Sequence, residues 1–207
     1  MRWLTRCICA ALLVLWPFAG RAAEPIKSAD STDAEAAHAL EQLPIAGYLK
    51  NLLVWDEKDS NWQVARGADA PNERASVVIV HLWADWCKPC REEFPILREL
   101  AEQVEGAHPG KVQFLYLSQT QGQAEMQSFL FKYRARMPKA PIYQNTALGE
   151  FLLRQLSRTG LPLPITLILD DRRVVRSVLI GSVARHRGYV AGTVARLVSL
   201  SQGSSQP

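Results

Sequence analysis

Cysteine is scarce in this chain, whose 207 residues include only four. Cys7 and Cys9 lie in an apolar segment near the N-terminus, which leaves Cys87 and Cys90 as the only pair in the rest of the sequence. A pair so close together closes too small a loop to constrain the unfolded chain, whereas a disulfide-braced secreted domain has several bridges across longer loops. We therefore expect Cys87 and Cys90 to react rather than to brace the fold.

Ligands for a metal ion are scarce as well. A structural zinc site needs four ligands, usually Cys or His at short spacings, and only two cysteines remain outside the N-terminal segment. The histidines are scattered along the chain, at His38, His81, His108 and His186. The sequence thus predicts neither a metal site nor a cofactor.

The chain has no large excess of charge once its N-terminal segment is set aside. The whole sequence carries a net charge of +4, and removing the three arginines of residues 1–22, which contain no acidic residue, leaves +1. A nearly neutral protein gives no electrostatic reason to bind nucleic acid. We expect no nucleic-acid partner.

The main apolar run near the N-terminus is too short to span a membrane comfortably. It covers residues 7–18, follows Arg2 and Arg6, and precedes small residues that include Ala22. This is the pattern of a secretory signal peptide. We expect residues 1–22 to be cleaved and the protein to be periplasmic, with an uncleaved membrane anchor as the alternative.

Hydrophobic periodicity predicts an α/β domain over residues 45–200. The apolar run Val77–Trp83 is typical of a strand buried on both faces, and the residues after Cys87 have the three- and four-residue spacing of a helix. Further strands are expected at 52–55, 62–65, 112–117, 165–169 and 174–180, and further helices at 125–136, 148–156 and 189–200. Strand–helix alternation followed by a late hairpin predicts a mixed central sheet with helices on both faces. Residues 23–44 are expected to form a flexible or helical lead-in, and residues 201–207 a disordered tail.

Residues 83–90, W-A-D-W-C-K-P-C, connect the central strand to this helix. Only a thiolate attacks a disulfide, and the unpaired N–H groups and dipole of a helix N-terminus favour the anion. Because Lys88 adds a nearby cation, we expect the pKa of Cys87 to lie below that of a free thiol. Cys90, one turn later, can resolve a mixed disulfide, and Pro89 has the fixed φ that suits a first helical turn.

These residues resemble the active site of the thioredoxin superfamily, which reads W-x-x-W-C-x-P-C in many members. The continuation R-E-E-F-P at 91–95 is similar to the exported TlpA/ResA branch, which commonly carries Cys-x-x-Glu-x-Pro there. Residues 163–170, L-P-I-T-L-I-L-D, resemble the cis-proline strand of that family. The resemblance implies a thioredoxin fold over roughly residues 45–200.

The resemblance also implies roles for single residues. Trp86 would shield the disulfide, and a cis bond before Pro164 would lie against the cysteines and leave the backbone of Leu163 free to pair with a substrate strand. Pro162 is the competing candidate for the cis bond. Glu93 would hold or pass a proton if it is buried, and would be an ordinary solvated glutamate if it is not.

His81 stands six residues before Cys87, where thioredoxin itself has a buried aspartate. It is a second candidate for proton relay, although a buried strand histidine is more often simply satisfied by hydrogen bonds. Asp85 is expected to face solvent and Trp83 to be structural.

The function implied by the resemblance is that of an exported thiol–disulfide oxidoreductase. It would reduce protein disulfides through the Cys87–Cys90 dithiol and be kept reduced by a membrane electron donor. The Lys-Pro interior of the motif leaves the direction open, so an oxidant that donates its disulfide to envelope proteins is the alternative. A copper-binding chaperone that uses the thiols as soft ligands is a further alternative, and it would need a third ligand near the pair.

Overall fold

The computed structural model describes residues 31–203. The strands are β1 Leu53–Asp56, β2 Asn61–Val64, β3 Val77–Trp83, β4 Val112–Ser118, β5 Ile142–Gln144, β6 Ile165–Leu169 and β7 Val175–Ile180. The α-helices are α1 Ser31–Leu40, α2 Lys88–Ala107, α3 Gln123–Tyr133, α4 Thr146–Leu156 and α5 Arg187–Gly203. Short 3₁₀ helices are η1 Ala46–Leu49, η2 Gly67–Asp69, η3 Arg134–Arg136 and η4 Val183–Arg185. The predicted signal peptide lies outside the described residues.

All seven strands form one sheet in the order β2-β1-β5-β4-β3-β6-β7. The strand β3 lies inside it, parallel to β4 and antiparallel to β6. Every residue of β3 is buried, because side chains that alternate along a strand meet a helical layer on either face. The mixed sheet predicted from the sequence is confirmed.

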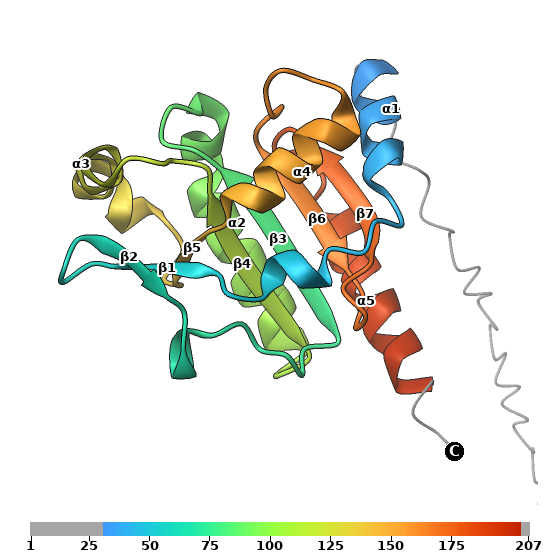
Figure 1. The fold of residues 1–207 in the computed structure, drawn as a ribbon. Helices are drawn as coiled ribbons and strands as arrows, with labels where there is room; N and C mark the ends of the chain where they lie inside the picture. The colour runs from blue at the N-terminus through green and yellow to red at the C-terminus, as the bar shows by residue number, and fades with distance from the viewer. Residues whose placement is uncertain (1–30, 204–207) are drawn as a thin grey trace, which may run out of the picture.

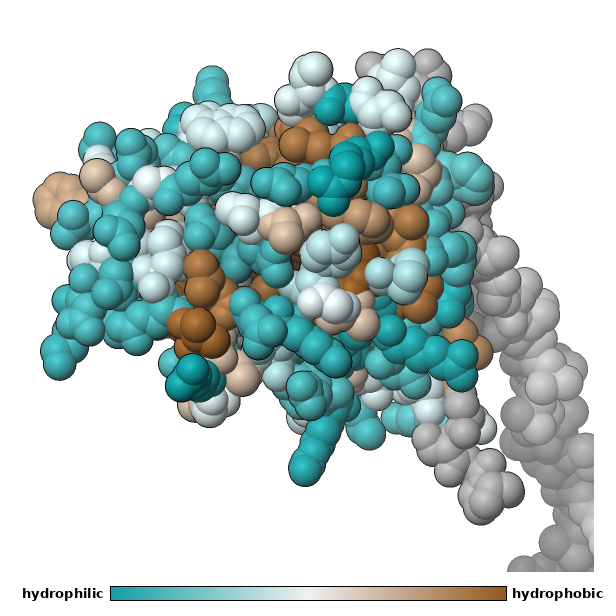
Figure 2. Space-filling view, viewed as in Figure 1, coloured by the Kyte–Doolittle hydropathy of each residue, from teal (hydrophilic) through white to brown (hydrophobic). Residues whose placement is uncertain are grey.

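Two apolar cores lie on the two faces of this sheet. Ile79 packs on one face with residues of α2, α3 and α5, whereas Val80 packs on the other with residues of α1 and α4. Figure 1 shows α4 in front of the strands and α2 behind them. Polar residues cover most of the face on the α4 side (Figure 2).

Several predicted elements have their expected bounds. The strands at Val77–Trp83 and Ile165–Leu169 match residue for residue. The helix α5 reaches Gly203, three residues into the predicted tail, and residues 204–207 lie outside the described chain. None of the helices in residues 31–203 is long and apolar enough to cross a membrane.

The strand β5 was not predicted. It has only three residues, too few to show a periodicity. It pairs in parallel with β4 and antiparallel with β1. It therefore joins the predicted β1–β2 hairpin to the central sheet.

The segment that precedes the domain is tied to the far edge of the sheet. The amide of Gln42 donates to the carbonyl of Val175 at 2.8 Å, and that of Ile45 to the carbonyl of Arg173 at 3.0 Å. The helix α1 also contacts α4 and β7. Most of the predicted lead-in is thus part of the packed structure.

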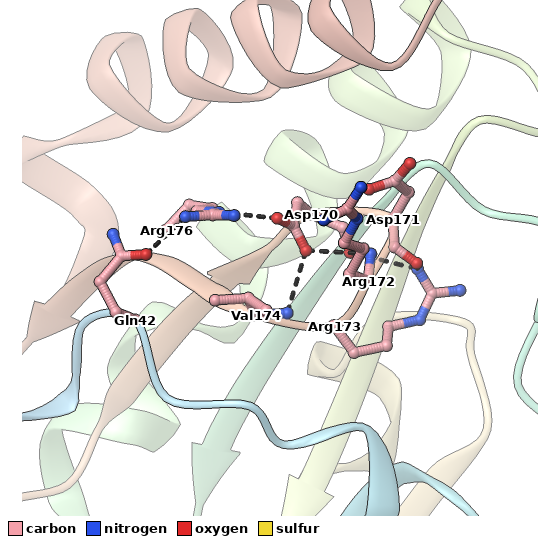
Figure 3. A network of polar contacts seen from close by, with 7 residues as sticks. All are labelled: Gln42, Asp170, Asp171, Arg172, Arg173, Val174 and Arg176. Atoms are coloured by element: carbon pink, nitrogen blue, oxygen red, sulfur yellow. Dashed lines mark hydrogen bonds and ion pairs between the residues drawn. The ribbon is translucent and has the colours of Figure 1, made fainter. Parts of the chain in front are cut away.

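Asp170 organises the turn between β6 and β7 (Figure 3). Its Oδ1 accepts the amides of Arg172 and Val174, each at 3.0 Å. Its Oδ2 accepts Nε of Arg176 at 2.7 Å, and Arg176 in turn donates to the side chain of Gln42. One carboxylate therefore links the turn, the edge strand and the N-terminal segment.

We expect Asp170→Ala to lower the free energy of unfolding by about 2 kcal/mol, because it leaves two amides and a guanidinium without their acceptor. Urea denaturation measures the change. Asp171→Ala is the matched control, since that exposed side chain accepts none of these hydrogen bonds, and it should cost no more than about 0.5 kcal/mol. Equal losses in the two variants would contradict this account of the turn.

Candidate active site

Cys87 is the N-cap of α2 and forms a disulfide with Cys90. The S–S bond is 2.04 Å long, and the amide of Cys90 donates to Sγ of Cys87 at 3.3 Å. Pro89 occupies the first turn of the helix. The sequence places the reactive pair at this helix start because the apolar strand ends at Trp83 and proline at an N-terminal position favours helix initiation.

The two sulfurs differ in their access to solvent. Cys87 retains 4% of its surface exposed, whereas Cys90 has none. Of the two residues, Cys87 therefore retains a small contact with solvent, and Cys90 lies in the interior.

The residues around the pair divide between surface and core. Trp86 is 64% exposed, so it lies on the surface beside the disulfide. Trp83 is fully buried and packs against Phe94 and Phe129, with ring centroids 5.3 and 5.1 Å away. Nζ of Lys88 lies 3.9 Å from a carboxylate oxygen of Glu92, so the positive charge expected beside Cys87 is partly offset.

Asp85 does not simply face solvent, as the sequence suggested. Its carboxylate accepts the hydroxyl of Thr120 at 2.9 Å, and its amide donates to the same oxygen at 3.0 Å. Nη1 of Arg91 donates to its carbonyl at 2.8 Å. No pattern in the sequence indicates these partners, since Thr120 lies in the loop that follows β4. Together they hold the turn that presents Cys87.

The pairing of β3 with β6 brings the second motif to the same edge of the sheet. Leu82 is the register partner of Ile165, so the loop that carries Cys87 leaves the sheet where Pro164 enters it. The bond between Leu163 and Pro164 is cis, as the resemblance implies, and Pro162 is not the cis residue.

The backbone of Leu163 is not entirely free, and this corrects the prediction. Its amide donates to the carbonyl of Leu161 at 2.9 Å, because the chain turns tightly just before the cis bond. A substrate strand would have to displace this contact to use the Leu163 N–H.

Glu93 is buried, with 2% of its surface exposed, whereas the side chain of its neighbour Glu92 is 64% exposed. Its Oε2 accepts the amide of Val183 at 2.9 Å. The reading of Glu93 as an ordinary solvated glutamate is therefore wrong. Burial is consistent with the proton role that the resemblance implies.

His81 is also buried, and the structure brings it against Glu93. Its Nε2 lies 3.3 Å from Oε1 of Glu93, and its Nδ1 lies 3.0 Å from Oγ1 of Thr166. The sequence suggested each residue separately and gave no indication that they meet. Among residues 31–203, no group of three His, Cys, Asp or Glu side chains is arranged to hold a metal ion.

Comparisons with known proteins agree with this geometry. Residues 61–148 match the family described as Thioredoxin. The chain is 44% identical over 54 residues to thioredoxin of Alicyclobacillus acidocaldarius. That alignment covers 26% of this chain and 42% of the thioredoxin. The chain is 24% identical over 103 residues to the thiol–disulfide oxidoreductase ResA of Bacillus cereus, covering 49% of this chain and 54% of ResA.

Among solved structures, the thioredoxin-related protein of Neisseria meningitidis serogroup B aligns with a TM-score of 0.47 at 21% identity. That alignment covers 66% of this chain and 93% of the other. The chain spans less than two thirds of the length of either curated relative described above. The family match and the mixed sheet together confirm the predicted thioredoxin fold.

In the reduced protein we expect iodoacetamide to alkylate Cys87 at least tenfold faster than Cys90, because only Cys87 retains any contact with solvent and because a helix N-terminus favours its thiolate. Mass spectrometry of digests taken over time measures both rates. In urea the two rates should converge. Faster labelling of Cys90 in the folded protein would reverse the assignment of the attacking sulfur.

Proposed function

Residues 61–148 match the Thioredoxin family and the chain is similar to ResA, and from this premise we propose that it is a thiol–disulfide oxidoreductase that acts through Cys87 and Cys90. The observation that carries the proposal is a disulfide at a helix N-terminus, with Cys90 fully buried and Cys87 slightly exposed, beside a cis-proline strand. Its substrates are disulfides or dithiols of other proteins.

The reaction follows from the positions of the two sulfurs. In the reduced protein, the thiolate of Cys87 attacks a substrate disulfide, forms a mixed disulfide and releases one substrate thiolate. Cys90 then loses its proton and attacks Sγ of Cys87, so the second substrate sulfur leaves and the Cys87–Cys90 bond forms. Two electrons have passed to the substrate.

We propose that the protein works as a reductant in the periplasm and receives its electrons from a donor in the membrane. The secretory pattern of residues 1–22 and the similarity to ResA support this assignment.

Glu93 is the proposed acid–base group of the second step. It lies three residues after Cys90, on the same face of α2, and is buried where water cannot easily replace it. Its carboxyl group is therefore suited to take the proton that Cys90 loses and to return it when the disulfide is reduced.

We expect Cys90→Ser to stall the reaction at the mixed disulfide, because no second sulfur remains to resolve it. Non-reducing gels followed by mass spectrometry should detect substrate proteins linked to Cys87 in cells that express the variant. Cys87→Ser is the control and should trap far fewer, because Cys90 is fully buried. If the two variants trap equally little, the oxidoreductase proposal is wrong.

We expect Glu93→Gln to slow disulfide exchange by roughly tenfold or more at its optimum and to change the pH profile, because glutamine cannot exchange a proton. Glutamine can still accept the Val183 amide, so the fold should persist. Stopped-flow exchange rates between about pH 5 and 9 measure the effect. Glu102→Gln, an exposed position on the same helix, should match the unmodified protein, and an unchanged profile in Glu93→Gln would remove Glu93 from the mechanism.

A further inference from the structure

His81 and Glu93 form an isolated polar contact inside the apolar interior. His81 is the only ionisable residue of β3, and both side chains are almost completely buried. His81 Nε2 and Glu93 Oε1 lie 3.3 Å apart. Within residues 31–203 neither atom makes a hydrogen bond of good geometry, so the 3.3 Å contact is the polar interaction that pairs them.

The other polar atom of each side chain, Nδ1 of His81 and Oε2 of Glu93, is held by a different element. Thr166 on β6 contacts Nδ1 of His81 at 3.0 Å, and the Val183 amide on η4 holds Oε2 of Glu93 at 2.9 Å. These contacts orient Nε2 and Oε1 toward each other. The resulting chain of groups connects the cysteine helix to the strand that begins after Pro164.

The Thr166 hydroxyl allows this pair to exist in two protonation states with the same contacts. When the hydroxyl donates to Nδ1, a neutral His81 carries its proton on Nε2 and donates to the Glu93 carboxylate. When the hydroxyl accepts from Nδ1–H, the pair holds one proton more in total, with one on Nδ1 and one between Nε2 and Oε1. A hydroxyl is both donor and acceptor, so the pair can gain or lose one proton while the hydrogen bond between Nδ1 and Thr166 is kept.

We infer that His81, Glu93 and Thr166 form one proton-holding unit, in which His81 is a positioning residue that acts through Glu93. The inference rests on the proposed function. As Cys90 attacks Sγ of Cys87, its thiol proton passes to the unit, the bond from Cys87 to the substrate sulfur breaks, and the substrate leaves as a thiolate. Reduction of the disulfide returns the proton to Cys90.

Other titratable groups around the unit are few. Tyr116 on β4 is the register partner of His81, with ring centroids 6.5 Å apart, and burial raises its pKa far above its ordinary value, so it stays neutral. On α2, Cys90 lies one turn before Glu93 and is buried like it, whereas Arg91 is partly exposed and Glu92 is exposed. On η4 and just after it, Arg185 is exposed and His186 is partly exposed.

The test compares the pH dependence of exchange in matched variants. A proton whose binding to the unit depends on the redox state changes the equilibrium constant with glutathione by up to tenfold per pH unit. We expect His81→Asn, Glu93→Gln and the double variant to lose the same part of this dependence, because either change alone dismantles the unit. His108→Asn, the same substitution at the end of α2, should keep it.

Thr166 provides a second comparison. Thr166→Val removes the hydroxyl and should change the pH profile as His81→Asn does, whereas Thr166→Ser retains the hydroxyl and should restore it. Effects of His81→Asn and Glu93→Gln that add in the double variant would overturn the inference, as would a His81→Asn profile equal to that of the unmodified protein. An unmodified protein that fails to exchange at any pH would instead refute the proposed function.

A measurement on the unmodified protein does not depend on any variant folding. The ¹⁵N shifts of the His81 ring report which nitrogen carries a proton. We expect these shifts to differ between the oxidised and the reduced protein at the same pH. Identical shifts in both redox states across the folded pH range would contradict a redox-linked proton on the unit.

Discussion

The antiparallel pairing of β3 with β6 is the constraint on which the site depends. It places the end of β3, which leads to Cys87, beside the residue that follows Pro164. The same register makes His81 the partner of Thr166. Because a slip by one residue would turn every side chain of a strand to the other face, the two apolar cores fix this register. The cores therefore set the position of the disulfide, the cis-proline and the buried polar contact together.

Much of this arrangement could be predicted from the sequence, for identifiable reasons. The run Val77–Trp83 is buried on both faces, so its continuous apolar pattern is unambiguous. Cysteine spacing and Pro89 mark the start of α2, and the spacing from Phe94 to Val104 marks its buried face. The cis bond at Pro164 was a different case, because nothing in the local sequence distinguishes it from Pro162. There the prediction depended on the resemblance to a family.

The parts that could not be predicted depend on contacts between distant segments. The strand β5 has three residues and exists because β1 and β4 both pair with it. Thr120 reaches Asp85 only because β3 and β4 run in parallel and end together. The engaged amide of Leu163 reflects a tight local turn, which a comparison of motifs does not show. Hydrophobic patterns predict which residues are buried, but they do not predict which polar atoms come into contact.

The contact of His81 with Glu93 is one that sequence patterns could not predict. Removing one partner of a buried pair leaves an uncompensated polar or charged group and is strongly destabilising, whereas replacing both by apolar residues of similar volume is often neutral or stabilising. Stability alone therefore gives no reason for a histidine inside a strand of otherwise apolar residues. The position of His81 gives a reason, because this residue lies between the helix that carries Cys90 and the strand that follows Pro164. A group that can take up a proton is useful at that position, where a buried thiol must lose one.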